Sequence, residues 1–251
     1  MRWLKLTVAY DGTGYAGWQI QPDRQTVQGV VEVAWRQITQ EDARVSAAGR
    51  TDAGVHAYGQ VVGLATESCL PIDDLLRALN AVLPNDVAVL AIEPVPAGFH
   101  ATRDALGKTY RYQIHNGRVP SVFDRYFAWH YPQPLDAAAM HAAAQALVGR
   151  HDFSSFETAG SERPDSIRTI HEISVARGVG DLNDRITLTV TGDGFLYNMV
   201  RTIVGTLVEV GKGARDIGWP AEVLAAHDRR QAGQTAPPQG LFLVRVEYDS
   251  T

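Results

Sequence analysis

The alternation of apolar and polar residues predicts the elements of the first part of the chain. Residues 4–10, 44–48, 58–65 and 87–92 alternate or run apolar over strand lengths. Apolar residues recur at helical spacing over 27–38, directly after Thr26, which is a typical N-cap residue. A second helix is predicted over 71–83, because this stretch opens with a proline and ends before Pro84. The order strand, helix, strand, strand, helix, strand is ferredoxin-like.

The second part of the chain repeats this order with insertions. Its pattern predicts strands over 108–114, 167–175, 185–190 and 241–248, and helices over 136–148, 198–210 and 221–227. We therefore predict an α+β fold with two ferredoxin-like (RRM-like) halves, residues 1–104 and 105–251. Their mainly antiparallel sheets are expected to join into one, with an active-site cleft between the halves. Residues 158–166, which include Arg163, are predicted to form a loop that either faces RNA or is simply solvated.

Composition places the chain among globular proteins. It has 251 residues, of which 45% are hydrophobic and 20% charged. The first residues lack an apolar signal core, and no apolar run reaches the length of a bilayer span, so we expect a cytoplasmic protein without membrane association. Cys69 is the single cysteine and offers neither an internal disulfide nor a thiolate metal site.

The net charge argues mildly against a nucleic-acid partner. It is −5 at pH 7, and an acidic chain repels phosphate on average. However, all but three of the 23 basic residues are arginines, and the arginine fork suits bidentate contacts to phosphate. Charge therefore permits RNA as a partner without requiring it.

The densest group of candidate site residues lies at 47–57. Gly49 and Gly54 bracket Arg50 and Asp52, which predicts a tight polar loop between two strands, a favourable place for chemistry. Asp52 could be catalytic or could only cap a turn, and Arg50 could be a solvated charge. Asp52 and His56 also have the i, i+4 spacing of a metal-ligand pair, so a metal hydrolase is one alternative. One such pair is weak evidence, and we predict no metal.

Two further regions, a predicted strand and a predicted helix, place polar groups in an apolar setting. Tyr110 and Tyr112 share one face of a predicted strand, where each ring could belong to the core or stack on a ligand. Arg201 falls in the first turn of an apolar helix, where its charge opposes the helix dipole. If it is buried it needs an anion; otherwise it is an ordinary surface arginine.

Five strings, taken together, resemble the tRNA pseudouridine synthase A family. They are Tyr15-Ala16-Gly17-Trp18-Gln19, the 49–57 loop, Lys108-Thr109-Tyr110-Arg111-Tyr112, the 194–205 segment, and Pro238-Gln239-Gly240-Leu241. The resemblance implies an isomerase that converts uridine to pseudouridine in the anticodon stem-loop, at tRNA positions 38 to 40. It implies Asp52 as nucleophile, Arg201 as its ion partner and Tyr110 as the group that stacks on the base and transfers a proton. Arg50 and Leu241 would contact the substrate.

The resemblance also implies partners. The family acts as a homodimer that binds one tRNA across two subunits, and it uses neither a cofactor nor a metal. Pseudouridine formation leaves the composition of the nucleoside unchanged, so it needs no redox carrier. Two departures from the family pattern are Thr109, where other members often have a basic residue, and the variable pair Tyr197-Asn198.

Two questions stay open at the level of sequence. Ferredoxin-like halves are also the RRM plan, so the alternative is a non-catalytic RRM-like RNA-binding protein; the chain has no Gly-Phe-Gly-Phe-like string to favour it. The route is also open: Asp52 could attack C1′ of the sugar, attack the uracil ring, or remove a sugar proton to give a glycal.

Overall fold

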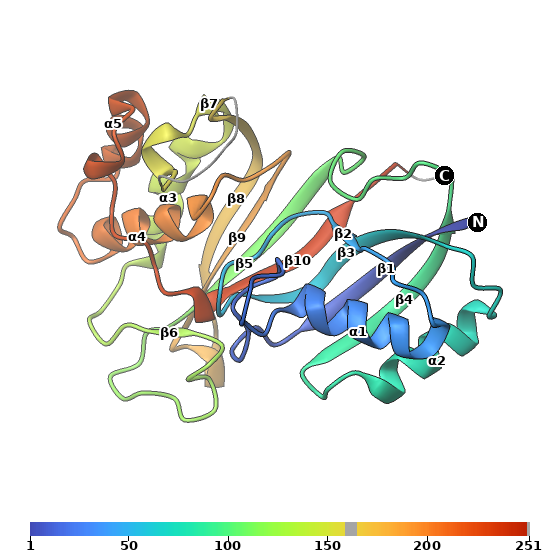
Figure 1. Cartoon of the computed structure of the whole chain (residues 1–251). Helices are drawn as coiled ribbons and strands as arrows, with labels where there is room; N and C mark the ends of the chain where they lie inside the picture. Colours follow the sequence, from blue (N-terminus) through green and yellow to red (C-terminus); the bar gives the residue numbers. More distant parts are fainter. Residues whose placement is uncertain (159–164, 250–251) are drawn as a thin grey trace. The chain divides into compact units, whose positions relative to one another are not determined.

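The computed structural model describes residues 1–158 and 165–249. Arg163 lies outside these residues, so the expectation for the 158–166 loop is untested. By its internal contacts the chain forms two compact units. The first unit comprises Met1–Leu106 with Phe242–Thr251, and the second unit is Gly107–Leu241. Each unit contains strands and helices of its own (Figure 1).

The sheet of the first unit is built on β1 (Arg2–Tyr10). β1 pairs antiparallel with both β3 (His56–Thr66) and β4 (Val87–Val95), and the short β2 (Ser46–Ala47) pairs antiparallel with β3. β10 (Leu241–Glu247) adds to β3 in parallel, with Phe242 opposite His56. The alternating residues of β1, Leu4, Leu6 and Val8, are fully buried. The predicted strands of this part are therefore present.

Two helices cover one face of this sheet (Figure 1). α1 (Val27–Thr39) begins where predicted, because Thr26 accepts a hydrogen bond from the N–H of Gly29. α2 (Ile72–Val82) starts after Pro71. β2 is shorter than the predicted 44–48 strand, because the Val45 N–H donates to the Glu32 carboxylate (3.1 Å) rather than to a neighbouring strand.

The sheet of the second unit has the order β5-β9-β8-β7, antiparallel throughout. These strands are Gly107–His115, Arg185–Gly192, Ile167–Arg177 and Gly149–Asp152 respectively. The short β6 (Trp129–His130) pairs in parallel with β5. The helices α3 (Ala137–Ala144), α4 (Met199–Gly211) and α5 (Trp219–Ala226) gather beside these strands (Figure 1).

The structure corrects two details of the second unit. The predicted 136–148 helix ends at Ala144 and continues only as the 3₁₀ turn Gln145–Leu147, and Gly149 then takes φ +110°, outside helical geometry. β6 and β7 were not predicted. The α+β class and the mainly antiparallel pairing are confirmed, whereas the two-half ferredoxin-like plan, the joined sheet and the cleft stay predictions. In the described part of the chain, no helix has the length and apolarity to cross a membrane.

Candidate active site

Asp52 lies in the loop between β2 and β3, and the backbone on either side of it is fixed. The Thr51 carbonyl accepts from the Trp18 N–H (3.0 Å), and the Asp52 carbonyl accepts from the Val55 N–H (3.1 Å). The Thr51 hydroxyl also shares a hydrogen bond of 2.8 Å with the Tyr10 hydroxyl, and both side chains are buried. The Asp52 residue itself is half-buried, so its position is set by the backbone while its side chain retains access to solvent.

The loop that follows β1 lies directly against the Asp52 loop. Gly17 has φ +94°, and a Cβ added there would lie 2.6 Å from the Thr51 carbonyl oxygen and 3.1 Å from the Asp52 carbonyl carbon. The carbonyls of Gly17 and Trp18 in turn accept the N–H groups of Val27 (3.2 Å) and Gln28 (3.0 Å), at the start of α1. The two loops and the α1 N-terminus therefore form one hydrogen-bonded block.

His56, the first residue of β3, is buried beside this block. Its Nδ1 lies 3.0 Å from the Gly12 N–H and 3.1 Å from the Asp11 carboxylate. Its ring stacks on Phe242 with centroids 4.7 Å apart. Among the described residues, no group of three or more histidine, cysteine, aspartate and glutamate side chains is placed to hold a metal ion.

The environment of Tyr10 keeps its hydroxyl protonated. Burial raises the pKa of Tyr10 to about 12, although hydrogen bonds with Thr51 and Gln60 act in the opposite direction. Tyr10 therefore remains a neutral hydrogen-bond partner of Thr51 at physiological pH. The sequence did not predict this hydrogen bond, because Tyr10 and Thr51 are far apart in the chain and neither belongs to a pattern that indicates a contact.

In the second unit, Tyr110 and Tyr112 lie on one face of β5, as predicted. Tyr110 is opposite Val190 of β9, is 7% exposed, and meets the ring of Phe195 edge-on at 5.1 Å. Tyr112 is fully buried and donates its hydroxyl to the Pro237 carbonyl (2.7 Å). Burial raises the pKa of Tyr112 above its ordinary value, so its hydroxyl stays a donor. Tyr112 is therefore a core residue, and Tyr110 lies near the edge of the core.

Arg201 ties the start of α4 to the segment that precedes β10. Its Nε donates to the Ala236 carbonyl (2.7 Å) and its Nη1 to the Asn198 side-chain oxygen (2.6 Å). Asn198 takes the left-handed conformation at the N-cap, with φ 60°. These contacts fix the guanidinium in a half-buried position. The pairing of Arg201 with Asp52 stays a prediction.

The remaining predicted residues lie at a turn and on a surface. The turn Pro238–Gly240 leads into Leu241, which is buried at the start of β10. Here a Cβ on Gly240 would lie 2.6 Å from the Tyr112 ring, so this close approach requires glycine. Arg50 is exposed in the Asp52 loop. The structure thus groups Asp52 with Arg50 in the first unit, and connects Arg201 and Leu241 to the Tyr112 region within the second.

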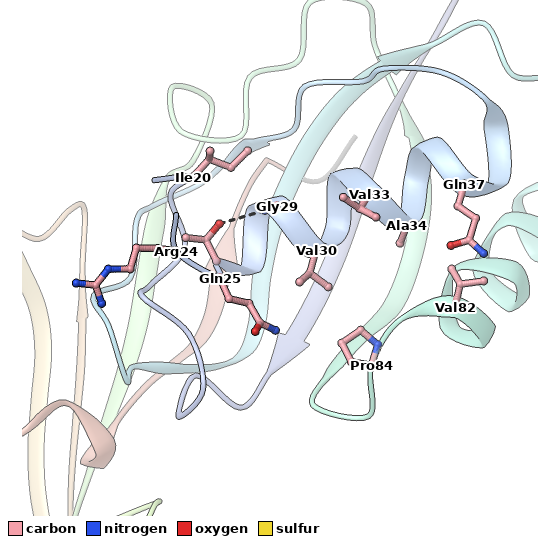
Figure 2. A pocket seen from close by; sticks show the side chains of 11 residues that line it. Ile20, Arg24, Gln25, Gly29, Val30, Val33, Ala34, Gln37, Val82 and Pro84 are labelled. Atoms are coloured by element: carbon pink, nitrogen blue, oxygen red, sulfur yellow. Dashed lines mark hydrogen bonds between the residues drawn. The ribbon is translucent and has the colours of Figure 1, made fainter. Parts of the chain in front are cut away.

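A separate pocket of about 460 Å³ lies in the first unit, between α1 and the end of α2 (Figure 2). Val30, Val33, Val82 and Pro84 supply its apolar wall, and Arg24 lies at one end. None of its lining residues belongs to the Asp52 loop. The pocket is therefore not part of the candidate site.

A family model described as tRNA pseudouridine synthase matches residues 6–102 and 143–249. The matched ranges include Asp52, Arg201 and Leu241, while Tyr110 lies between them. The chain belongs to this family. It is 48% identical over 248 residues to tRNA pseudouridine synthase A of Brevibacillus brevis, covering 99% of this chain and 100% of that one. It is 49% identical over 247 residues to the protein of that name from Moorella thermoacetica, covering 98% and 99%.

This tRNA pseudouridine synthase is an isomerase that acts on tRNA. The family therefore excludes the non-catalytic RNA-binding alternative. A solved Cbf5-Nop10-Gar1 complex contains a chain that is 14% identical, with a TM-score of 0.36 over 81% of this chain. This protein spans 54% of that solved chain.

Proposed function

We propose that this tRNA pseudouridine synthase acts on uridines of the anticodon stem-loop, with Asp52 as nucleophile and without a cofactor. The observation that supports Asp52 is its setting: a half-buried side chain on a loop whose backbone is bonded on both sides. Such fixation holds a reacting group in place before substrate arrives, which lowers the entropic cost of reaction. An aspartate that only caps a surface turn would not need a backbone held in place by β1, the loop after β1 and the start of α1.

The other residues have complementary roles in this proposal. Arg201 is the cation that favours the ionised form of Asp52. Tyr110 stacks on the uracil that has been turned out of the RNA stack, and its hydroxyl transfers a proton. Leu241 contacts the same base, and Arg50 binds phosphate. The uracil leaves the sugar through N1 and rejoins it through C5, which releases the C5 proton, so the reaction requires no electron carrier.

The proposal extends to the molecule as a whole. We place the enzyme in the cytoplasm as a homodimer of chains with two ferredoxin-like halves and a cleft. The β4-β1-β3-β2 pairing of the first unit supports the ferredoxin-like plan for that half. A net charge of −5 supports the dimer, because an acidic chain must gather its arginines on a shared surface to bind a polyanion. Recognition by shape suits a double-stranded stem of RNA.

The deciding experiment is Asp52→Asn, because an amide has nearly the shape of a carboxylate but is neither nucleophile nor base. We expect turnover to fall by more than about 10³-fold, while tRNA affinity and the melting temperature stay close to wild type. The assay measures tritium release from tRNA labelled at C5 of uridine, one anticodon-arm site at a time. Asp42→Asn is the matched control, since the Asp42 side chain is exposed, lies outside the 47–57 loop and pairs with Arg36 (3.4 Å).

Two outcomes would contradict parts of this proposal. A folded, tRNA-binding Asp52→Asn variant with the wild-type rate would show that Asp52 only caps a turn. Tritium release from wild-type enzyme confined to uridines outside the anticodon arm would leave the nucleophile intact and overturn the substrate site.

A further inference from the structure

A turn at the end of β1 lies against the part of the Asp52 loop that follows the aspartate. This turn consists of residues 11–15, and we call it the Tyr15 turn. The Tyr15 carbonyl accepts from the Gly54 N–H (3.4 Å). A Cβ added to Gly12 would overlap the Val55 carbonyl oxygen, so the two backbones are in direct contact there.

The Tyr15 turn is held in one shape by its own hydrogen bonds. The Asp11 carboxylate accepts from the N–H (2.9 Å) and the hydroxyl (2.6 Å) of Thr13. The Tyr15 N–H donates to the Gly12 carbonyl (3.0 Å). The Gly12 N–H also lies 3.0 Å from Nδ1 of the buried His56. A turn bonded in this way moves as a unit, so a shift at one end of it reaches the Asp52 loop.

The other side of the Tyr15 turn is attached to Asp86, which directly precedes β4. The Asp86 carbonyl accepts from the Asp11 N–H (2.9 Å), and the Asp86 carboxylate accepts from the Tyr15 hydroxyl (2.7 Å). Burial and this carboxylate raise the pKa of Tyr15 above its ordinary value, so the hydroxyl remains a donor. A hydrogen bond to a charged acceptor is about twice as strong as one between neutral groups.

We propose that Asp86 is a positioning residue for Asp52, acting through Tyr15 on the backbone that follows the nucleophile. The inference rests on the nucleophile of the proposed function. Contacts of Thr51 hold the backbone on one side of Asp52, and the bond from Gly54 to the Tyr15 turn holds it on the other. A carboxylate whose backbone is fixed on both sides keeps one orientation toward the substrate. Its misplacement therefore costs rate more than affinity.

A purely structural role for this hydrogen bond is the alternative. Its loss would then lower the melting temperature and leave the rate of the folded enzyme unchanged. A positioning role instead lowers the single-turnover rate at unchanged tRNA affinity. It also requires Asp86 and Tyr15 to act together, so that the loss of one removes the effect of the other.

The test measures single-turnover tritium release from tRNA labelled at C5 of uridine, with saturating enzyme. We expect Asp86→Ala and Tyr15→Phe each to lower the rate ~10–30-fold at nearly unchanged tRNA affinity, and the double variant to be no slower than the slower single variant. Asp86→Asn keeps an acceptor oxygen, so it should recover most of the rate lost in Asp86→Ala. Asn85→Ala is the matched control, because Asn85 is the exposed neighbour of Asp86. Melting curves establish that each variant is folded at the assay temperature.

The possible contrary results are distinct. Wild-type rates in Asp86→Ala and Tyr15→Phe, together with an inactive Asp52→Asn, would remove this inference and leave the proposed nucleophile intact. A wild-type rate in Asp52→Asn would remove both. Losses that multiply in the double variant would show that Asp86 does not act through Tyr15. An Asp86→Asn variant as slow as Asp86→Ala would contradict the role of the hydrogen bond.

Discussion

At the residue scale, Tyr110 and Tyr112 lie two positions apart on one face of β5 but have different neighbours. The hydroxyl of Tyr112 is bonded to the Pro237 carbonyl, and its ring lies against Gly240. The ring of Tyr110 meets Phe195 edge-on and is slightly more exposed. The strand period places the two residues on the same face, so only their contacts distinguish Tyr112, which supports the fold, from Tyr110, which we propose meets the substrate.

This difference predicts opposite effects of the same substitution. Tyr110→Phe keeps the ring and removes the hydroxyl, so turnover should fall while tRNA affinity is retained. Tyr112→Phe leaves a buried carbonyl without its donor and should lower the free energy of unfolding by ~1–3 kcal/mol. Single-turnover kinetics, filter binding and urea unfolding measure these effects. Equal losses of affinity and turnover in Tyr110→Phe would mean that Tyr110 is structural.

At the element scale, the position of Asp52 depends on three consecutive segments that are distant from Asp52 in the chain: β1, the loop after it and the start of α1. β1 supplies Tyr10, the loop after β1 supplies Trp18 and Gly17, and that loop also caps the first N–H groups of α1. A change in the packing of any one segment is therefore transmitted to the Asp52 backbone. Because all of these contacts except the Tyr10–Thr51 hydrogen bond are made by backbone atoms, close approach of the loops matters more than the identity of most side chains.

Gly17→Ala tests this dependence. The new Cβ would lie 2.6 Å from the Thr51 carbonyl at a residue with φ +94°, so we expect a loss of ~1–3 kcal/mol of stability and a fall in turnover larger than the fall in tRNA affinity. Gly14→Ala is the control in the same loop, since a Cβ there meets nothing within 4 Å. Equal activity in the two variants, measured by tritium release, would show that the loop contact does not position Asp52.

At the scale of the whole molecule, buried tyrosines couple stability to pH. Burial is the largest cause that raises the pKa of Tyr10, Tyr15, Tyr112 and Tyr248. The folded chain therefore keeps phenolic protons that the unfolded chain releases above a pH of about 10. The stabilisation is fully present below that pH and is lost as the pH rises through the folded pKa values.

We therefore expect the free energy of unfolding to fall between about pH 10 and pH 12, by up to ~1.4 kcal/mol per pH unit for each such tyrosine. Tyr10→Phe should reduce this fall, because it removes the group whose pKa is about 12 in the folded chain. Urea unfolding at a series of pH values measures the slope. A slope in Tyr10→Phe equal to that of wild type would show that Tyr10 does not titrate with unfolding.

The sequence pattern alone was sufficient to predict the features that depend on neighbouring residues. The spacing of apolar residues predicted α1, α2 and the long strands, and Thr26 predicted the start of α1. The motif around Asp52 indicated the family. These features depend on a few adjacent residues and on the periods of helix and strand, so they can be read without knowing the rest of the molecule.

Contacts between distant residues were decided only by the tertiary structure. Glu32 shortens β2 by taking the Val45 N–H, and Phe242 near the end of the chain lies beside His56 in the first unit. The hydrogen bond from Tyr15 to Asp86 likewise joins two segments that are distant in the chain. Each depends on which segments meet after folding, and burial, hydrogen-bond partners and exposure are properties of that packing that a short window of sequence does not contain.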